Sequence, residues 1–120
     1  MRPHLRVFNR TRRSVLVERG TVASNVWKRL VGLMGCRVFS RGQGLLLKGE
    51  QAIHTFGMLL PIDVLYLDGS GRVLRAVNDM APARLGPIVR GTRDVLELPA
   101  GTLAATGTSV GDELEFQIIP

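Results

Sequence analysis

The chain has 120 residues, with 16 Lys and Arg against 10 Asp and Glu, and hydrophobic residues make up 45% of it. This balance is typical of one folded domain, residues 1–120, and excludes a disordered chain. The single cysteine, Cys36, excludes an internal disulfide. The longest apolar stretches fall short of the roughly 18 residues that a membrane span requires.

Positive charge is concentrated in the first half of the chain. Residues 1–50 carry eleven Lys or Arg against two Glu, a net charge of +9, whereas residues 51–120 carry a net charge of −3. Such an arginine-rich half could attract the phosphates of a nucleic acid. We favour a solvated basic surface instead, because the sequence offers no basic helix and few aromatic residues for base stacking.

The basic N-terminus predicts a location for the protein. The apolar stretch that follows, Ser14 to Val17, stops at Glu18. It is too short for the apolar core of a secretory signal. We therefore expect a cytoplasmic protein, and the lone thiol agrees with that setting.

Short segments with alternating or β-branched residues predict strands along most of the chain. Two pairs of segments surround polar turns and predict hairpins, and the second, around Asp68 to Gly71, is the clearer. The predicted strands are Leu5–Phe8, Val15–Val17, Leu45–Leu47, Asp63–Leu67, Arg72–Val77, Asp94–Leu98 and Glu113–Ile118. Gly42 and Gly44 predict a mobile loop ahead of the third of these strands.

Two segments have helical features. The first spans residues 24–34, where Ser24 is a suitable N-cap and apolar residues recur at helical spacing. We expect this helix to bury Trp27, Leu30 and Met34 against the sheet. The second is a single turn, Thr102 to Ala105, closed by Gly107. The predicted fold is therefore mainly β, a compact β-sandwich or distorted barrel with one principal short helix.

A series of motifs resembles a known family. The series comprises Arg29-Leu30-Val31-Gly32-Leu33-Met34, Ile53 to Asp68, Val95 to Gly101, and Val110-Gly111-Asp112. In order and spacing it resembles the prokaryotic family catalogued as domain of unknown function 192, over roughly residues 5–118. His54-Thr55-Phe56-Gly57-Met58 stands where many relatives have Trp-Met-Lys-Asn-Thr. The resemblance implies a compact, mainly β sandwich or barrel with a short helix, and it implies no particular activity.

Four polar residues are the candidates for a site. His54 and Thr55 precede the apolar turn that ends at Pro61, and Asp63 follows it, so the turn could bring them to one rim. Glu97 shares its strand face with Val95, and an acid on a partly apolar face invites a raised pKa or a partner such as Arg29 or Arg93. Each has a structural alternative: His54 and Thr55 could bond backbone at a bend, Asp63 could cap a turn, and Glu97 could form an ion pair.

Three functions remain open at this point. We favour a binding module in which His54, Thr55, Asp63 and Glu97 rim a cleft for a small ligand or a partner's peptide segment. The alternative is a small enzyme with His54 as general base, assisted by Asp63 or Glu97. Nucleic-acid binding through the arginine-rich half is the weaker alternative. The sequence contains no paired metal-ligand spacing and no nucleotide loop, so we expect neither a metal nor a cofactor.

Overall fold

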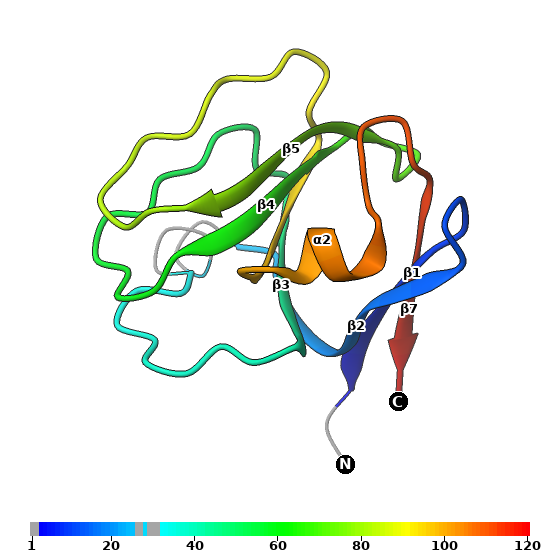
Figure 1. The fold of residues 1–120 in the computed structure, drawn as a ribbon, viewed down its shortest axis with the longest axis horizontal. Coiled ribbons are helices and arrows are strands. Elements are labelled where there is room, and N and C mark those ends of the chain that lie inside the picture. The colour runs from blue at the N-terminus through cyan, green and yellow to red at the C-terminus, as the bar shows by residue number, and fades with distance from the viewer. Residues whose placement is uncertain (1–2, 26–27, 29–31) are drawn as a thin grey trace.

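The computed structural model of the protein describes residues 3–25, 28 and 32–120, and Figure 1 shows its fold. The elements follow in the order β1 (His4–Asn9), β2 (Ser14–Ala23), β3 (Gly42–Lys48), β4 (Ile62–Leu67), β5 (Val73–Met80), β6 (Asp94–Pro99), α2 (Thr102–Thr106) and β7 (Leu114–Ile119). The predicted mainly β class is confirmed, and α2 is a short helix of five residues.

The strands form one sheet in the order β5-β4-β6-β3-β2-β1-β7. Neighbouring strands are antiparallel, except that β2 and β3 are parallel. The two edge strands approach each other at one end, where Arg72 and Glu113 form an isolated bridge. The sheet is not closed into a barrel beyond this contact.

Both predicted hairpins are present. β1 pairs with β2 across the polar turn at residues 10–13, and β4 pairs with β5 across the turn at residues 68–72. The carboxylate of Asp68 orders the second turn, because it accepts hydrogen bonds from the backbone amides of Ser70 and Arg72 at 2.9 and 3.0 Å. These turns therefore behave as their local sequences predict.

The prediction of a mobile loop at Gly42 and Gly44 is wrong, because both glycines belong to β3. The reason is a close approach between strands. A Cβ added to Gly44 would lie 2.5 Å from Val17 Cγ2, and one added to Gly20 would lie 2.7 Å from Val17 Cγ1. Glycine at these two positions makes room for the Val17 side chain where β2 and β3 run parallel.

Two apolar cores lie on opposite faces of the central strands. β4 is buried along its whole length, and β6 is buried from Val95 onward. The first core contains Leu5, Val7, Leu16, Val17, Leu46, Leu65, Leu67, Val73, Leu96, Leu98, Leu103 and Leu114. The second core contains Ala23, Leu45, Leu47, Ile53, Met58, Ile62, Val64, Tyr66, Met80 and Val95.

Irregular segments cover the second core. They are residues 32–41, 49–61 and 81–93, which gather on the side of the molecule away from β1, β2 and β7 (Figure 1). Leu33, Phe39 and Val89 from these segments pack against the second core. The first core, in contrast, contains Leu103 of α2. The segment that carries His54 therefore lies over the second core.

Five of the eleven residues of the helix expected over residues 24–34 lie outside the described residues, namely 26–27 and 29–31, and Trp27 and Leu30 are among them. Met34 is described, and the expectation that it is buried is wrong, because its exposed fraction is 46%. It lies over Gly57, where an added Cβ would be 2.8 Å from Met34 Cε. The predicted turn at residues 102–105 is confirmed as α2, with Gly107 as its left-handed C-cap. In the described part of the chain, no helix is long and apolar enough to cross a bilayer.

Candidate functional site

A cavity of about 240 Å³ lies at the boundary between the sheet and the irregular segments. We call it the Glu97 cavity. The described residues that line it are Gly32, Leu47, Glu50, Ala52, Ile53, His54, Leu85 and Glu97. Strands β3 and β6 contribute Leu47 and Glu97, and the other residues come from the irregular segments. Apolar walls with a few polar groups are the usual composition of a small-molecule site.

Glu97 is the most unusual side chain in this cavity. It has an exposed fraction of 1%, and its Oε1 atom has no hydrogen-bond partner in the described structure. The cross-strand neighbours of Glu97 are Leu45 on β3 and Val64 on β4, which belong to the second core. The predicted sharing of a face with Val95 is confirmed, because Val95 belongs to that same core.

Burial changes the protonation of Glu97. Its removal from water, assisted by the nearby charge of Glu50, raises the pKa of Glu97 to about 8. Glu97 is therefore mostly a neutral acid at pH 7, and a neutral acid offers one O–H donor together with acceptor oxygens. The expected arginine partner is not seen in the described region. The side chain of Arg93 instead lies against Gly69 in the β4–β5 turn, and Arg29 is outside the described residues.

His54 reaches the cavity from a short bridge between two irregular segments. It pairs with Leu85 as an isolated β-bridge, and its ring stacks on Phe56 with 5.6 Å between the centroids. Its Nδ1 atom accepts a hydrogen bond from the backbone amide of Phe56 at 3.2 Å. This bond assigns the proton of the neutral ring to Nε2, so His54 can present an N–H donor.

Thr55 fastens the neighbouring loop and is not among the described residues that line the cavity. Its hydroxyl donates to the carbonyl of Ala81 at 2.7 Å and accepts from the amide of Arg84 at 2.8 Å. Its own amide donates to the carbonyl of Arg84 at 2.8 Å. These bonds hold residues 81–84 against residue 55, and they thereby place Leu85 beside His54.

Asp63 also serves the backbone rather than the cavity. Its Oδ1 accepts the amide of Asp79 at 2.9 Å, and its Oδ2 accepts the amide of Leu103 at 2.9 Å. Asp79 belongs to a bulge, because Asn78 and Asp79 on β5 lie opposite the single residue Asp63 on β4. Leu103 is in the first turn of α2, whose N-cap Gly101 has no side chain to accept its amides. One carboxylate therefore joins the bulge to the helix.

The structure thus separates the four side chains that were expected to share one rim. His54 and Glu97 line the same cavity, whereas Asp63 and Thr55 do not. We correct the predicted rim accordingly. Asp63 lies across from Leu98 and Glu97 lies across from Val64, so the alternation of strand side chains places the two carboxylates on opposite faces of the sheet.

The sequence reasoning missed Glu50 and Leu85 as lining residues. Glu50 comes three positions after the end of the predicted strand at residues 45–47, and this proximity was the available signal. Leu85 had none, because a long-range bridge to His54 positions it. As for metals, the described residues include no group of three or more His, Cys, Asp and Glu side chains arranged to hold an ion.

Comparisons with known proteins agree with this architecture. The family model DUF192, described as "Uncharacterized ACR", matches residues 8–116. A UPF0127 protein from Thermococcus sibiricus is 28% identical over 116 residues, which cover 93% of this chain and 75% of that protein.

Two solved structures have a similar fold. A protein of unknown function from Novosphingobium aromaticivorans has a TM-score of 0.79 at 21% identity, covering 93% of this chain and 83% of its own. A protein from Sinorhizobium meliloti, described as a candidate transcription regulator, has a TM-score of 0.80 at 26% identity, covering 95% of this chain and 92% of its own.

Proposed function

Because the chain belongs to the DUF192 family of uncharacterized proteins, we propose that it is a binding domain that holds a small ligand in the Glu97 cavity. One observation carries this proposal. The Oε1 atom of Glu97 is buried without a hydrogen-bond partner in the described structure, and its side chain lines a cavity. The fold establishes a small β-domain, and the proposal assigns a ligand-binding role to it.

The Oε1 atom of Glu97, which is unpartnered in the described structure, has an energetic cost. A buried polar atom without a partner costs about 1–3 kcal/mol of stability. A hydrophobic residue would fit between Leu45 and Val64 without this penalty, since both neighbours are apolar. A ligand that donates a hydrogen bond to Glu97 would offset the penalty. Glu97 is therefore better suited to recognition than to packing.

The size of the cavity favours a small molecule over a peptide segment. A volume of about 240 Å³ is the space of about eight water molecules. It is below the usual range for drug-sized ligands. Leu47 and Ile53 are buried walls for an apolar body, and the exposed Leu85 lies at the rim.

His54 suits binding better than catalysis. Since its Nδ1 already accepts the amide of Phe56, its Nε2 carries the proton and acts as a donor. A general base needs a ring nitrogen that is free to accept a proton. The separation of Asp63 from the cavity also removes one of the two acids that the enzyme alternative invoked. We therefore base the proposal on binding alone.

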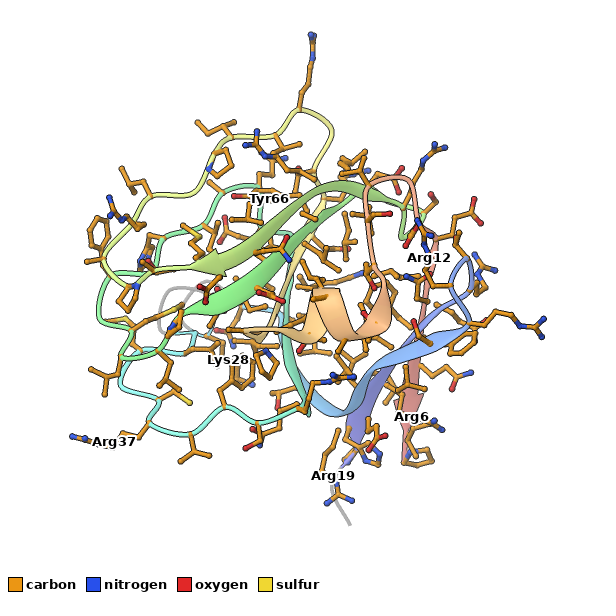
Figure 2. All side chains as sticks on the ribbon, in the orientation of Figure 1. Arg6, Arg12, Arg19, Lys28, Arg37 and Tyr66 are labelled. Carbon is orange, nitrogen blue, oxygen red and sulfur yellow. The ribbon has the colours of Figure 1, made fainter. Side chains whose placement is uncertain are left out.

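The proposal needs neither a nucleic acid nor a membrane as partner. Arg6, Arg19 and Arg37 extend outward from the fold in Figure 2, and none of them lines the Glu97 cavity. They fit the solvated basic surface that the sequence favours. We propose a cytoplasmic location, in which the free thiol of Cys36 would stay reduced.

A fragment screen by NMR tests the proposed function. Isotope-labelled protein is mixed with a library of small polar and apolar fragments, and the amide signals are followed. We expect at least one fragment to shift the signals of Ile53, His54 and Glu97 together. Ala52→Trp should block the response, because Ala52 lines the cavity and is exposed enough to accept the larger ring.

The matched control is Ala104→Trp, which adds the same ring at an exposed position on α2. This variant should keep the response of the unmodified protein. The absence of any cavity-centred response across the library would overturn the proposed function. A response that survives Ala52→Trp would place the binding site elsewhere, with the same consequence.

A further inference from the structure

The described ionisable side chains that line the Glu97 cavity include two acids and no lysine or arginine. Among the described residues that line it, the ionisable side chains are Glu50, His54 and Glu97, and neither a lysine nor an arginine contributes. This lining is unusual for a chain that carries 16 Lys and Arg against 10 Asp and Glu. Within the described part of the chain, the ionisable side chains of this cavity are therefore two acids and a histidine.

We propose that the ligand is a small primary amine with a short apolar body, bound as its ammonium ion against the carboxylate of Glu97. This inference rests on the proposed function, since it names the class of ligand for the same cavity. The ammonium group would face Glu97, and the apolar body would lie against Leu47 and Ile53.

The donor count supports an amine. Glu97 Oε1 lacks a donor in the described structure, and an ammonium group brings three. A hydrogen bond between two charged groups is roughly twice as strong as one between neutral groups, and the apolar surroundings of Glu97 strengthen it further. An alcohol would supply one neutral donor, and Glu97 would stay protonated, so no pair of opposite charges would form.

An anionic ligand fits the same position less well. A carboxylate or phosphate brings no N–H donor for Glu97 Oε1, and its negative charge would lie in the cavity that the Glu50 side chain also lines. Glu50 itself accepts the backbone amides of Gln51 and Ala52 through Oε1. These bonds orient the Glu50 side chain, so the proposal assigns the contact with the ammonium group to Glu97 alone.

Binding of an ammonium ion must displace a proton. Before the ligand binds, Glu97 is a neutral acid below about pH 8. When R–NH₃⁺ binds, the O–H bond of Glu97 breaks, its proton passes to bulk water, and the carboxylate that remains pairs with the ammonium. One proton is released for each ligand bound, so below pH 8 the affinity should increase by up to about tenfold for each unit by which the pH is raised.

Among the residues that the structure describes, three other ionisable groups face Glu97 from the elements around it. Glu50 lies on the segment after β3, and its charge raises the pKa of Glu97. His54 lies on the same irregular segment, and its Nδ1 is engaged by Phe56. Tyr66 on β4 shares the second core, where burial raises the pKa of its hydroxyl, so it stays neutral. Among these groups, Glu97 is the one placed to exchange a proton on binding.

Calorimetry with three matched probes tests the inference. Benzylamine, benzyl alcohol and benzoate share one ring and differ in charge, and each is titrated in buffers with different heats of ionisation. We expect benzylamine to bind at least about tenfold more tightly than benzyl alcohol near pH 8, with release of one proton below that pH. Benzoate should not bind.

Two variants test whether Glu97 is the residue responsible for amine binding and proton release. Glu97→Gln keeps the shape of the side chain but cannot become anionic, so it should lose at least about tenfold in benzylamine affinity and all proton release. Glu18→Gln makes the same change at an exposed position on β2 and should change neither quantity.

The outcomes separate this inference from the proposed function. Tighter binding of benzyl alcohol or benzoate, or amine binding without proton release, would overturn the inference that the ligand is an amine. The proposal that the cavity binds a ligand would still stand. Binding of other fragments in the NMR screen, but of none of the three probes, would have the same meaning. A screen in which no fragment responds would overturn the proposed function itself.

Discussion

Asp63 and Glu97 lie on neighbouring strands and are both buried, yet their carboxylates meet opposite surroundings. Asp63 faces the side of the first core and accepts two backbone amides. Glu97 faces the side of the second core, and its Oε1 has no partner in the described structure. The same chemical group is thus a fastener on one face of the sheet and a candidate binding group on the other.

Burial alone does not reveal the role of a carboxylate in this fold. An exposed fraction near zero is shared by Asp63 and Glu97 and does not separate their roles. The hydrogen-bond partners do separate them, because a satisfied buried carboxylate stabilises the fold, whereas an unsatisfied one costs stability. Glu97 is also the one of the two that lines a cavity.

The largest effect should come from removing the Asp63 carboxylate. Asp63→Ala removes the acceptor of the Asp79 amide and of the buried Leu103 amide, and it frees both the bulge in β5 and the start of α2. We expect a loss of about 4 kcal/mol in the free energy of unfolding, measured by urea titration with circular dichroism. A loss below about 1 kcal/mol would contradict the role of Asp63 as a fastener.

The pH dependence of stability should reveal Glu97. Its pKa is about 8 in the folded protein against an ordinary value of 4.5, so the folded state keeps a proton that the unfolded state has lost between these values. The contribution of Glu97 to the free energy of unfolding is largest below about pH 4.5. It declines as the pH rises toward 8 and does not change further above pH 8. Glu97→Gln cannot titrate and should escape this decline.

The measurement compares the two proteins across that window. Between about pH 5.5 and pH 8, the free energy of unfolding of Glu97→Gln should rise relative to the unmodified protein by about 3 kcal/mol. Glu18→Gln, at an exposed site on β2, should follow the unmodified protein. Parallel curves for Glu97→Gln and the unmodified protein would show that Glu97 is ionised in the folded state.

A smaller effect should follow from loss of the Thr55 hydroxyl. Thr55→Val preserves the shape but removes the bonds to Ala81 and Arg84, so we expect a loss of about 2 kcal/mol and faster hydrogen exchange at the Arg84 amide. Thr11→Val is the control, since Thr11 is exposed and accepts a single amide, that of Glu113. Equal effects of the two substitutions would contradict the fastening role of Thr55.

The smallest effect should be that of Tyr66→Phe. The Tyr66 hydroxyl is buried without a partner in the described structure, as Glu97 Oε1 is, but it is not part of the cavity lining. Its removal relieves an unsatisfied group and leaves a space the size of one oxygen, so the change in free energy should stay within about 1 kcal/mol. A cost above about 2 kcal/mol would indicate that the hydroxyl is satisfied.

Local sequence patterns were enough to predict most strands and the face of the sheet on which Glu97 lies. Alternation along residues 94–98 predicted that Glu97 shares a face with Val95, because the side-chain period of a strand is two. The turn around Asp68 likewise predicted the β4–β5 hairpin from its own residues. Both features depend on neighbours within a few positions of the chain.

The direction in which the Asp63 carboxylate points depends on long-range contacts, which no local sequence pattern contains. Asp63 was placed with His54 because one apolar turn separates them, but the bulge at Asp79 and the start of α2 decide where its carboxylate points. Leu85 joined the cavity through its bridge to His54, more than two dozen positions away. The local sequence around Gly44 predicts a loop, because the contact of Gly44 with Val17 arises from the parallel pairing of β2 and β3.

The pairing of β1 with β7 has a consequence for how the protein comes to fold. Leu5 pairs with Ile118, so the first strand of the chain is completed by the last. Closing so large a loop is slow, and sheets that depend on such distant pairs fold later than locally paired ones. On the ribosome, the hairpin of β4 and β5 can form early, whereas β1 keeps one open edge until residue 119 has emerged. The sheet is therefore completed only after its last strand has been synthesised.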